Sequence, residues 1–407
     1  MITKNNIPAG YKDSAVGIIP QEWKVATLGK LVSITSGESP SLFNLRDVGK
    51  YPYIKVEDMN NCEKYQADSR EYTDDERVVI AKGSIIFPKR GAAITNNKVR
   101  IAACQLYMDS NMMAITPNDL VCGDYLYFKI TYEQLFRIAD TSTIPQINNK
   151  HIIPYKICLP PLAEQRKIAE ILGVWDEAIE KQSRLIEKLE LRKRALIQRL
   201  LTGRTRLPGF TTPWQKVSYS EILKEIKRNM TWDDNEEYDL ISVKRRSGGL
   251  FHRERILGKD IKTKNLRPAK LGDFLISKMQ IVHGASGLVT EEFDGMKISG
   301  SYIALVAKSR EKVDMNFINW YSQTPYFYHQ TYVSSYGVHI EKMTFDLESF
   351  MSMNIMLPPL PEQKAIAEVL TMADNEIATH RKKLDALRLQ KRGLMQQLLT
   401  GKTRVKI

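Results

Sequence analysis

The stretch of sequence that decides the fold occurs twice. Residues 159–206 are LPPLAEQRKIAEILGVWDEAIEKQSRLIEKLELRKRALIQRLLTGRTR, and residues 357–404 are LPPLPEQKAIAEVLTMADNEIATHRKKLDALRLQKRGLMQQLLTGKTR. They align without a gap at an offset of 198 (357 − 159), with roughly half of the positions identical. An internal repeat of this quality predicts one structural unit that is built twice.

Each copy of the repeat has the pattern of one long helix. A proline pair stops the preceding strand, and Glu164 or Glu362 lies in the first turn, where the helix dipole favours negative charge. A Thr-Gly pair supplies the C-terminal stop in both copies. Between these ends lie about 40 residues, which would form a rod of roughly 60 Å.

Apolar positions in both copies alternate by four and three, which is the spacing of a coiled-coil seam. Two seam positions are polar in both copies, Gln182 with His380 and Lys193 with Lys391. We favour a less buried stretch of seam as their explanation, and the alternative is that they fix register and orientation. The residues predicted to pair the helices are Ile168, Leu172, Trp175, Ile179, Ile186, Leu189, Leu196, Leu200, Ile366, Leu370, Ala373, Ile377, Leu384, Leu387, Leu394 and Leu398.

The composition is that of a basic globular chain of 407 residues with a formal net charge of +13. Such an excess indicates a polyanionic partner, nucleic acid before acidic lipid. No apolar run is long enough to span a membrane, and residues 1–6 lack the apolar stretch of a signal peptide. The 4 cysteines form no C-x-x-C pair, which is typical of reduced thiols and predicts a cytoplasmic protein.

The segments that precede the two helices are also related, though more weakly. Pro20-Gln21-Glu22-Trp23 is echoed by Thr212-Pro213-Trp214, and the run from Gly83 to Arg90 is echoed by the run from Gly272 to Met279. Short β-type runs dominate, with helical patches near 124–139 and 314–328. The predicted fold class is therefore α+β: two pseudo-symmetric mixed α/β domains separated by a pair of long, antiparallel coiled-coil helices.

The doubled L-P-P-L-x-E-Q…I-A-E…L-L-T-G helix resembles the repeated regions of specificity subunits of Type I restriction–modification enzymes. The phrases Tyr53-Ile54-Lys55-Val56-Glu57-Asp58 and Thr143-Ile144-Pro145-Gln146-Ile147-Asn148 are similar to those of that family's target-recognition domains. The resemblance covers essentially the whole chain. It implies recognition domain 1 at residues 1–158, helix 1 at 159–206, recognition domain 2 at 207–356 and helix 2 at 357–407.

The resemblance also implies a division of labour between subunits. Each recognition domain would bind one half of a split, asymmetric site in double-stranded DNA, and the helix pair would set the gap between the halves. Two modification subunits carrying S-adenosylmethionine would methylate adenine, and restriction subunits using ATP and Mg²⁺ would cleave DNA. This chain itself is expected to hold no cofactor or metal, to have no catalytic residues and to contact no membrane.

Several motifs resemble parts of catalytic sites, but each lacks residues that the site would require. Pro160-Pro161 and Pro358-Pro359 are flanked by leucines, so they lack the polar and aromatic residues with which an adenine methyltransferase holds a flipped base. Gly401-Lys402-Thr403 imitates a phosphate-binding loop, but Gln396 stands where that loop requires glycine. The 6 histidines show no metal-ligand spacing. A self-contained methyltransferase or nuclease is therefore disfavoured.

Candidate DNA contacts in the first domain are polar and basic residues in loops that can meet phosphates or base edges. Gln146, Asn148 and Asn149 are preferred for base contacts because a proline fixes their backbone; the alternative is that this segment only caps a strand before the helix. The candidates are Ser36, Ser39, Ser41, Lys55, Lys89, Arg90, Asn97, Lys98, Thr143, Gln146, Asn148 and Asn149.

Candidates in the second domain centre on the most concentrated basic run of the chain, residues 244–249, which follows a strand-like stretch. A second loop matches the one that begins at Lys89, and a third matches the Thr143–Gln146 segment. The candidates are Lys244, Arg245, Arg246, Ser247, Lys278, Gln280, His283, Ser286, Tyr336 and His339.

Two further hypotheses stay open at this point. The residues at the helix starts, Glu164, Gln165, Glu362 and Gln363, could dock a partner subunit instead of serving the fold. The second hypothesis is that the chain is a basic coiled-coil scaffold that binds DNA without sequence preference. Such a scaffold would not need two recognition domains that differ in sequence.

Overall fold

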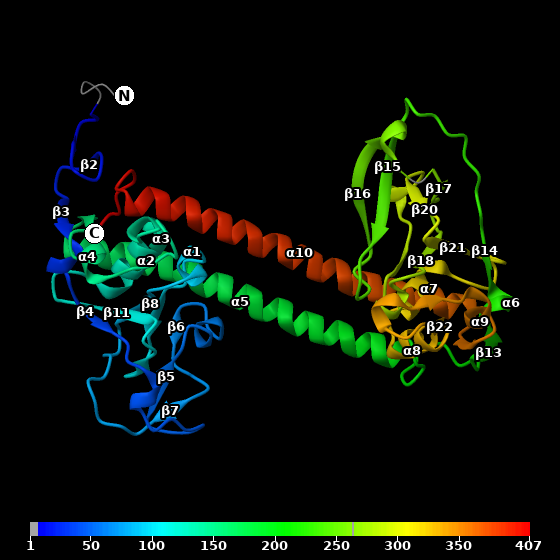
Figure 1. Cartoon of the computed structure of the whole chain (residues 1–407), viewed down its shortest axis with the longest axis horizontal. Coiled ribbons are helices and arrows are strands. Elements are labelled where there is room, and N and C mark those ends of the chain that lie inside the picture. The colour runs from blue at the N-terminus through cyan, green and yellow to red at the C-terminus, as the bar shows by residue number, and fades with distance from the viewer. Residues whose placement is uncertain (1–6, 263) are drawn as a thin grey trace. The chain divides into compact units, whose positions relative to one another are not determined.

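The computed structural model describes residues 7–262 and 264–407, and the chain divides into two compact units (Figure 1). Unit 1 consists of Met1–Arg184 and Lys382–Ile407, and unit 2 consists of Leu185–Arg381. The division cuts both long helices, α5 (Leu162–Leu200) and α10 (Leu360–Leu399), so each unit holds part of each helix. Residues 1–6, on which the prediction of no signal peptide depended, lie outside the described residues.

Unit 1 is built on a five-stranded sheet in the order β4-β11-β8-β9-β6 and a three-stranded sheet in the order β10-β5-β7. The first sheet contains β4 (Val32–Ser36), β11 (Met112–Pro117), β8 (Ile85–Pro88), β9 (Arg100–Ala102) and β6 (Tyr65–Gln66). The second contains β10 (Tyr107–Met108), β5 (Tyr51–Ile54) and β7 (Tyr72–Thr73). The remaining strands are β1 (Tyr11–Lys12) with β2 (Ile19–Pro20), and β3 (Lys24–Thr27) with β12 (Lys156–Leu159). Its short helices are α1 (Ala92–Thr95), α2 (Gly123–Glu133), α3 (Leu135–Ile138) and α4 (Asn149–Ile152).

Unit 2 contains two four-stranded sheets, in the orders β14-β21-β18-β19 and β16-β15-β20-β17. The first contains β14 (Leu223–Glu225), β21 (Tyr302–Ala307), β18 (Phe274–Ser277) and β19 (Ser286–Leu288). The second contains β16 (Leu250–Leu257), β15 (Glu237–Val243), β20 (Lys297–Ser299) and β17 (Leu266–Pro268). Two strand pairs complete it, β13 (Gln215–Ser218) with β24 (Asn354–Leu357), and β22 (Ser335–Tyr336) with β23 (Thr344–Phe345). Its helices are α6 (Tyr219–Ile222), α7 (Met315–Tyr321), α8 (Pro325–Val333) and α9 (Leu347–Met351).

The mixed helix and strand content of both units confirms the predicted fold class. The predicted helical patches coincide with α2 and α3 in unit 1 and with α7 and α8 in unit 2. Gly83 and Gly272, which the repeat aligns, both have φ of +86° and both stand two residues before an equivalent strand, β8 or β18. Glycine is needed at these two positions because other residues rarely adopt positive φ.

Both ends of each long helix are part of a domain core. Ile168 and Leu172 of α5 pack in the main core of unit 1, and Leu398 of α10 lies in the same cluster. Ile366 and Leu370 of α10 pack in the main core of unit 2. Apolar burial is the main stabilising contribution at such positions, so each domain is joined firmly to the helix segments of its own unit.

A buried carboxylate at the start of each helix fixes its connection to the domain. Glu164 is fully buried; it accepts from Trp23 Nε1 at 2.9 Å and from Arg404 Nε at 2.6 Å. Glu362 is buried in the same way and accepts from Trp214 Nε1 at 3.1 Å and from Arg206 Nε at 2.5 Å. The tryptophans are those of the echoed Pro-Gln-Glu-Trp and Thr-Pro-Trp phrases, so the weak repeat has a structural cause.

The glutamine that follows each of these carboxylates is also committed to the fold. Gln165 accepts from Cys122 N at 2.8 Å and donates to Pro160 O at 2.9 Å. Gln363 accepts from Asp314 N at 2.9 Å and donates to Pro358 O at 2.8 Å. With 0–1% exposure at Glu164, Gln165, Glu362 and Gln363, the hypothesis that the helix starts dock a partner is wrong.

The two helices run antiparallel within each unit, where they lie side by side (Figure 1). In unit 1 Asp176 forms an ion pair with Lys391, and in unit 2 Asp374 forms the matching pair with Lys193. Unit 2 adds Arg381 to Glu190 at 2.5 Å. All predicted pairing residues are buried or half-buried, and a salt bridge at a seam position favours one register.

The seam lysines do not lie in a less buried stretch of seam, which was the favoured interpretation. The side chains of Lys391 and Lys193 are only 15% and 20% exposed, and both pair with aspartate. Gln182 is buried as well. These positions are not a loosened stretch of seam, and the alternative, that they fix register, agrees better with the observed contacts.

Candidate nucleic-acid interface

The backbone of one lysine in each unit is clamped in the same way. Lys89 follows β8; its N donates to Asn111 O at 2.7 Å, and its O accepts from Ile147 N at 2.9 Å. Lys278 follows β18; its N donates to Ser301 O at 2.9 Å, and its O accepts from Phe345 N at 2.9 Å. We call this arrangement the lysine clamp. It places equivalent lysines at the C-terminal ends of β8 and β18.

A short loop lies beside the clamp in each unit, and we call it the closing loop. In unit 1 it comprises residues 141–145, closed by backbone hydrogen bonds of 2.9 and 3.0 Å between Asp140 and Gln146. In unit 2 it comprises residues 337–343, closed by the pairing of Tyr336 with Thr344 in β22 and β23. The segments that the sequence matched, Thr143–Gln146 and Tyr336–His339, thus overlap equivalent loops.

Cations and hydrogen-bonding groups gather around the clamp of unit 1. Gly91 N donates to Pro145 O at 2.9 Å, which holds the closing loop against the segment that contains Lys89 and Arg90. Partial burial, and secondly the positive charge of Arg90, lower the pKa of Lys89. A lysine held next to another cation in this way favours an anion such as a phosphate.

The serine segment at residues 36–41 lies at the same end of the sheet. β11 pairs with both β4 and β8, and Gly37 N donates to Met112 O at 3.0 Å next to the Lys89–Asn111 contact. Ser36 and Ser41 are exposed, and Ser39 is half-buried with its hydroxyl 2.9 Å from that of Ser41. The fold therefore brings together three of the predicted segments of domain 1.

Asn148 and Asn149 have a local role that the sequence left open. Asn148 precedes α4; its N donates to His151 Nδ1 at 3.1 Å, and its O accepts from His151 N at 2.9 Å. This reciprocal pair fixes the start of the helix. Asn149 is exposed as the first residue of α4. The capping alternative therefore describes Asn148 better than base contact does.

Asn97 is also engaged inside the domain. Its Nδ2 donates to Thr131 O at 2.8 Å, and its Oδ1 accepts from Leu135 N at 2.9 Å, so the amide ties the loop after α1 to α2 and α3. Its φ of +51° is one that asparagine tolerates better than most residues. These contacts argue against Asn97 as a DNA contact, whereas the neighbouring Lys98 is half-buried.

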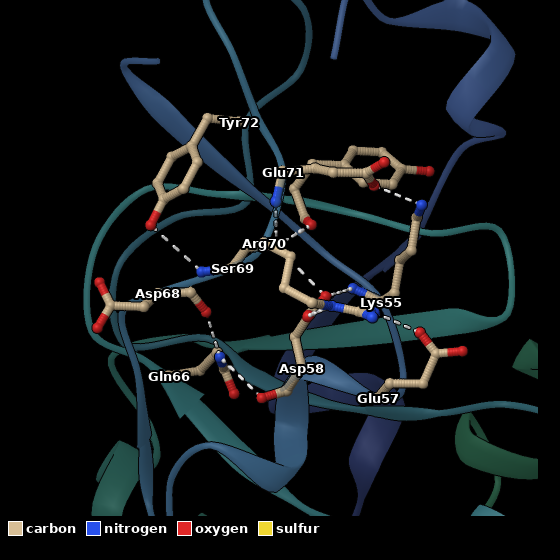
Figure 2. Close-up of polar contacts among 10 residues, drawn as sticks. Lys55, Glu57, Asp58, Gln66, Asp68, Ser69, Arg70, Glu71 and Tyr72 are labelled. Atoms are coloured by element: carbon tan, nitrogen blue, oxygen red, sulfur yellow. Dashed lines mark hydrogen bonds and ion pairs between the residues drawn. The ribbon is translucent and has the colours of Figure 1, made fainter. Parts of the chain in front are cut away.

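Lys55 belongs to a polar network around the buried carboxylate of Asp58 (Figure 2). Asp58 accepts from Lys55 N at 2.9 Å and from Arg70 Nε at 2.8 Å. The Lys55 ammonium forms an ion pair with Glu71, and Gln66 Nε2 donates to Asp68 O at 2.6 Å. The family-like phrase at residues 53–58 is thus explained by folding, and the contacts of Lys55 argue against the prediction that it binds DNA.

The basic run of unit 2 forms a strained turn between β15 and β16. Arg246 and Ser247 have φ of +58° and +52° without being glycine. The turn is held by two backbone hydrogen bonds, Arg246 N to His283 O at 2.7 Å and Ser247 N to Gly284 O at 2.9 Å. Strain that the surroundings enforce is typical of functional loops, and here it fixes the basic residues beside the second predicted loop.

Glu341 joins all three predicted segments of unit 2. Arg245 Nη2 lies 2.8 Å from one oxygen of this carboxylate, and His283 Nε2 lies 3.1 Å from the other. Arg245 comes from the basic turn, His283 from the loop after Lys278, and Glu341 from the closing loop. Lys244, Arg245 and Arg246 are exposed, so this convergence leaves the cations at the surface.

Three polar atoms in the segment from Gln280 to Ser286 lack a hydrogen-bond partner within the described part of the chain. They are Gln280 Oε1, His283 Nε2 and Ser286 Oγ, each buried; the contact of His283 with Glu341 does not have hydrogen-bond geometry. Unpaired buried polar atoms are uncommon and call for a bound partner or water. All three belong to residues predicted to contact DNA.

The sequence missed several residues at this site. The acidic side chain of Glu341 does not suggest a DNA contact. Nothing in the sequence indicates Tyr328, whose hydroxyl is 2.7 Å from that of Ser247. On β16, His252, Arg253 and Arg255 are exposed. The basic run Phe251-His252-Arg253-Glu254-Arg255 could have indicated them, but Asp239 bonds His252 and Arg255 at 2.8 and 2.9 Å.

Residues 7–262 and 264–407 contain no group of three His, Cys, Asp or Glu residues that could hold a metal ion. None of the described helices is long and apolar enough to cross a membrane. The proline pairs lie immediately before α5 and α10, which agrees with their interpretation as the boundary between strand and helix. Gln396 lies inside α10, so the residues before Gly401 do not form a phosphate-binding loop.

Comparison with known proteins identifies the architecture. A family model described as the Type I restriction modification DNA specificity domain matches residues 20–191 and again residues 212–389. The chain belongs to this family. Its members recognise the DNA sequence for a Type I restriction–modification system, so the predicted function of a DNA-binding, non-catalytic specificity subunit is confirmed.

Full-length relatives support the same conclusion. The Type I restriction enzyme MjaVIII specificity subunit of Methanocaldococcus jannaschii is 23% identical, with 95% of this chain and 94% of that protein covered. The putative type I restriction enzyme MjaX specificity subunit of the same organism is 26% identical, with 97% of both chains covered.

Two solved structures share the fold. The S subunit of a Type-I restriction-modification system from M. genitalium has a TM-score of 0.58 at 15% identity, with 98% of both chains covered. A chain from a study of complex assembly and conformational transition of the type I R-M system has a TM-score of 0.59 at 17% identity. That match covers 95% of this chain and 99% of the other.

Proposed function

We propose that each unit of this chain contacts one half of a split, asymmetric DNA site. The observation that carries the proposal is the lysine clamp with its closing loop, which occurs once in each unit with equivalent backbone hydrogen bonds. An equivalent backbone frame with different side chains suits two half-sites of different sequence. Phosphate contacts from the basic residues would position the DNA, and the polar side chains would contact base edges.

The residues proposed to bind DNA follow from their contacts. In unit 1 these are Lys89 and Arg90 for phosphates, with Thr143, Gln146 and the serines of residues 36–41 for further polar contacts. In unit 2 they are Lys244, Arg245, Arg246 and Lys278 for phosphates, with Gln280, His283, Ser286, Tyr336 and His339 for bases. Asn149, Lys98 and Ser247 border these groups.

The chain would act by directing partner subunits. Two modification subunits carrying S-adenosylmethionine would methylate adenine, one at each half-site, and restriction subunits using ATP and Mg²⁺ would cleave the DNA. The repeated sequence supports this stoichiometry, because two similar surfaces on one chain can receive two identical partners. The antiparallel helix segments would set the length of the DNA between the two half-sites, which no domain contacts for its sequence.

The test is to co-express the chain with the modification subunit of its own system and to map methylated adenines by long-read sequencing. The proposal predicts one split motif with two different halves. Deleting one heptad from both helices should then shorten the gap and leave both halves unchanged. Methylation by the chain alone, a continuous motif, or loss of a half-site after the heptad deletion would contradict the proposal.

A further inference from the structure

Each closing loop carries an aliphatic side chain that the protein leaves largely uncovered. Ile144 in unit 1 is 70% exposed, and Val338 in unit 2 is 96% exposed; Ile340, in the same loop as Val338, is less exposed, at 49%. Their neighbours in the loops are small or polar: Thr143 and Pro145 in unit 1, and Gly337 and His339 in unit 2. Single exposed aliphatic residues are common on proteins, so exposure alone carries no conclusion.

The stronger observation is that the two residues lie in equivalent loops. Both loops end two residues before the residue that donates to the clamped lysine, Ile147 to Lys89 and Phe345 to Lys278, in each case at 2.9 Å. Two domains of different sequence thus hold an aliphatic side chain in equivalent loops. Val48 and Val78, each 80% exposed, have no such counterpart and lie in a region of mixed charge, where Arg46 pairs with Asp74 and Lys50 pairs with Glu76.

The surroundings of the loops indicate what would cover these side chains. The unit 1 loop is bonded to the segment with Lys89 and Arg90, and the unit 2 loop contains Glu341, which contacts Arg245 and His283. Cations at this position would draw the DNA backbone onto the loops. The apolar surface that DNA then offers is that of its bases, as thymine methyl groups in the major groove or as ring faces at an opened step.

We propose that Ile144 and Val338 are apolar base contacts, one in each half-site, that contribute to sequence specificity. The inference rests on the proposed function, in which each unit contacts one half-site. It differs from the phosphate contacts in its salt dependence: covering an aliphatic side chain releases no counterions, so its loss should weaken binding equally at low and high salt.

The experiment measures binding of a fluorescent duplex that contains the mapped site, with the full chain assembled with its modification subunits. Val338→Ser and Ile144→Ser are compared with Val78→Ser, a matched control of similar exposure, and with the conservative Val338→Ile and Ile144→Val. We expect each of the first two changes to weaken specific binding about tenfold or more. The slope of log Kd against log salt should stay that of the unchanged protein, and the control and both conservative variants should bind as it does.

The two apolar sources on DNA are separated by a second arm with uracil in place of each thymine. If the protein contacts methyl groups, replacing one thymine of the second half-site by uracil weakens DNA binding by the unchanged chain but not by Val338→Ser. In the same way, replacing one thymine of the first half-site weakens binding by the unchanged chain but not by Ile144→Ser. If the protein contacts ring faces instead, uracil in either half-site leaves DNA binding unchanged. Fluorescence energy transfer between the duplex ends then reports a bend in the DNA that is smaller with the serine variants. Either result supports the proposal.

Unchanged binding by either serine variant, a loss equal to that of Val78→Ser, or a loss accompanied by a lower salt slope would overturn it. These outcomes are distinct from failure of the proposed function. That failure would appear as no preference of the unchanged protein for the mapped site, or as normal binding after Lys89, Arg90, Arg245 and Arg246 are replaced by alanine.

Discussion

The two units share a frame and differ in what the frame presents. Both clamp a lysine between the sheet and the closing loop, and both bury a glutamate at the helix start beneath a tryptophan and an arginine. Unit 1 surrounds its clamp with exposed serines and a proline-containing loop. Unit 2 has a strained basic turn, a glutamate bridge and three unpaired buried polar atoms. The shared part is backbone and buried charge, whereas the variable part is loop side chains, and we infer that fold and specificity are separated in this way.

The largest effect is expected from the shared glutamates. Glu164→Ala should destabilise unit 1, and Glu362→Ala should destabilise unit 2, by about 3–5 kcal/mol each, because an arginine and a tryptophan N–H lose a buried partner. Denaturant unfolding followed by hydrogen exchange would show the loss and its location. Equal loss of protection in both units from either change, or a loss below about 0.5 kcal/mol, would contradict independent anchoring.

The basic residues test whether both units bind phosphates. Lys89→Ala with Arg90→Ala, and separately Arg245→Ala with Arg246→Ala, should weaken DNA binding roughly tenfold to thirtyfold at 0.15 M salt and lower the salt slope by about 2. Fluorescence anisotropy at several salt concentrations is the measurement. Lys167→Ala with Lys181→Ala, on the exposed face of α5, is the control. An unchanged slope for one pair would remove that loop from the interface.

Substitutions at Asn97 and Ser286 distinguish a polar side chain that serves the fold from one that contacts DNA bases. Asn97→Ala should lower stability by about 1–2 kcal/mol, because two backbone groups lose their partner, and should leave the methylated motif unchanged. Ser286→Ala should leave stability nearly unchanged, since its hydroxyl has no partner among the described residues, and should weaken binding by about 1 kcal/mol with relaxed specificity in one half-site. The opposite pattern would mean that Ser286 serves the fold.

The smallest effect is expected at the seam. Asp374→Asn should cost about 0–1 kcal/mol because Asp374 is 53% exposed. Asp176→Asn should cost more, because Asp176 and Lys391 are 24% and 15% exposed. Urea unfolding of both variants gives the comparison. A larger loss for Asp374→Asn would show that exposure does not rank these two pairs.

The sequence was sufficient for what repeats. The 198-residue offset predicts both long helices, and the echoed tryptophans and glycines correspond to equivalent contacts in the two units. It was insufficient where a side chain has two uses. Lys55 and Asn97 are residue types that can contact DNA, yet partners that are distant in sequence, Glu71 and Thr131, engage them. Asn148 is engaged locally, by His151. Glu341 was missed for the converse reason, because its cationic partners come from two other loops.

The most direct test of the central claim is to exchange residues 207–356 for the corresponding segment of a relative and to map the methylated motif. If each unit contacts its own half-site, one half of the motif changes to that of the donor, while the other half and the gap stay as they were. A change in both halves, or in neither, would contradict the account.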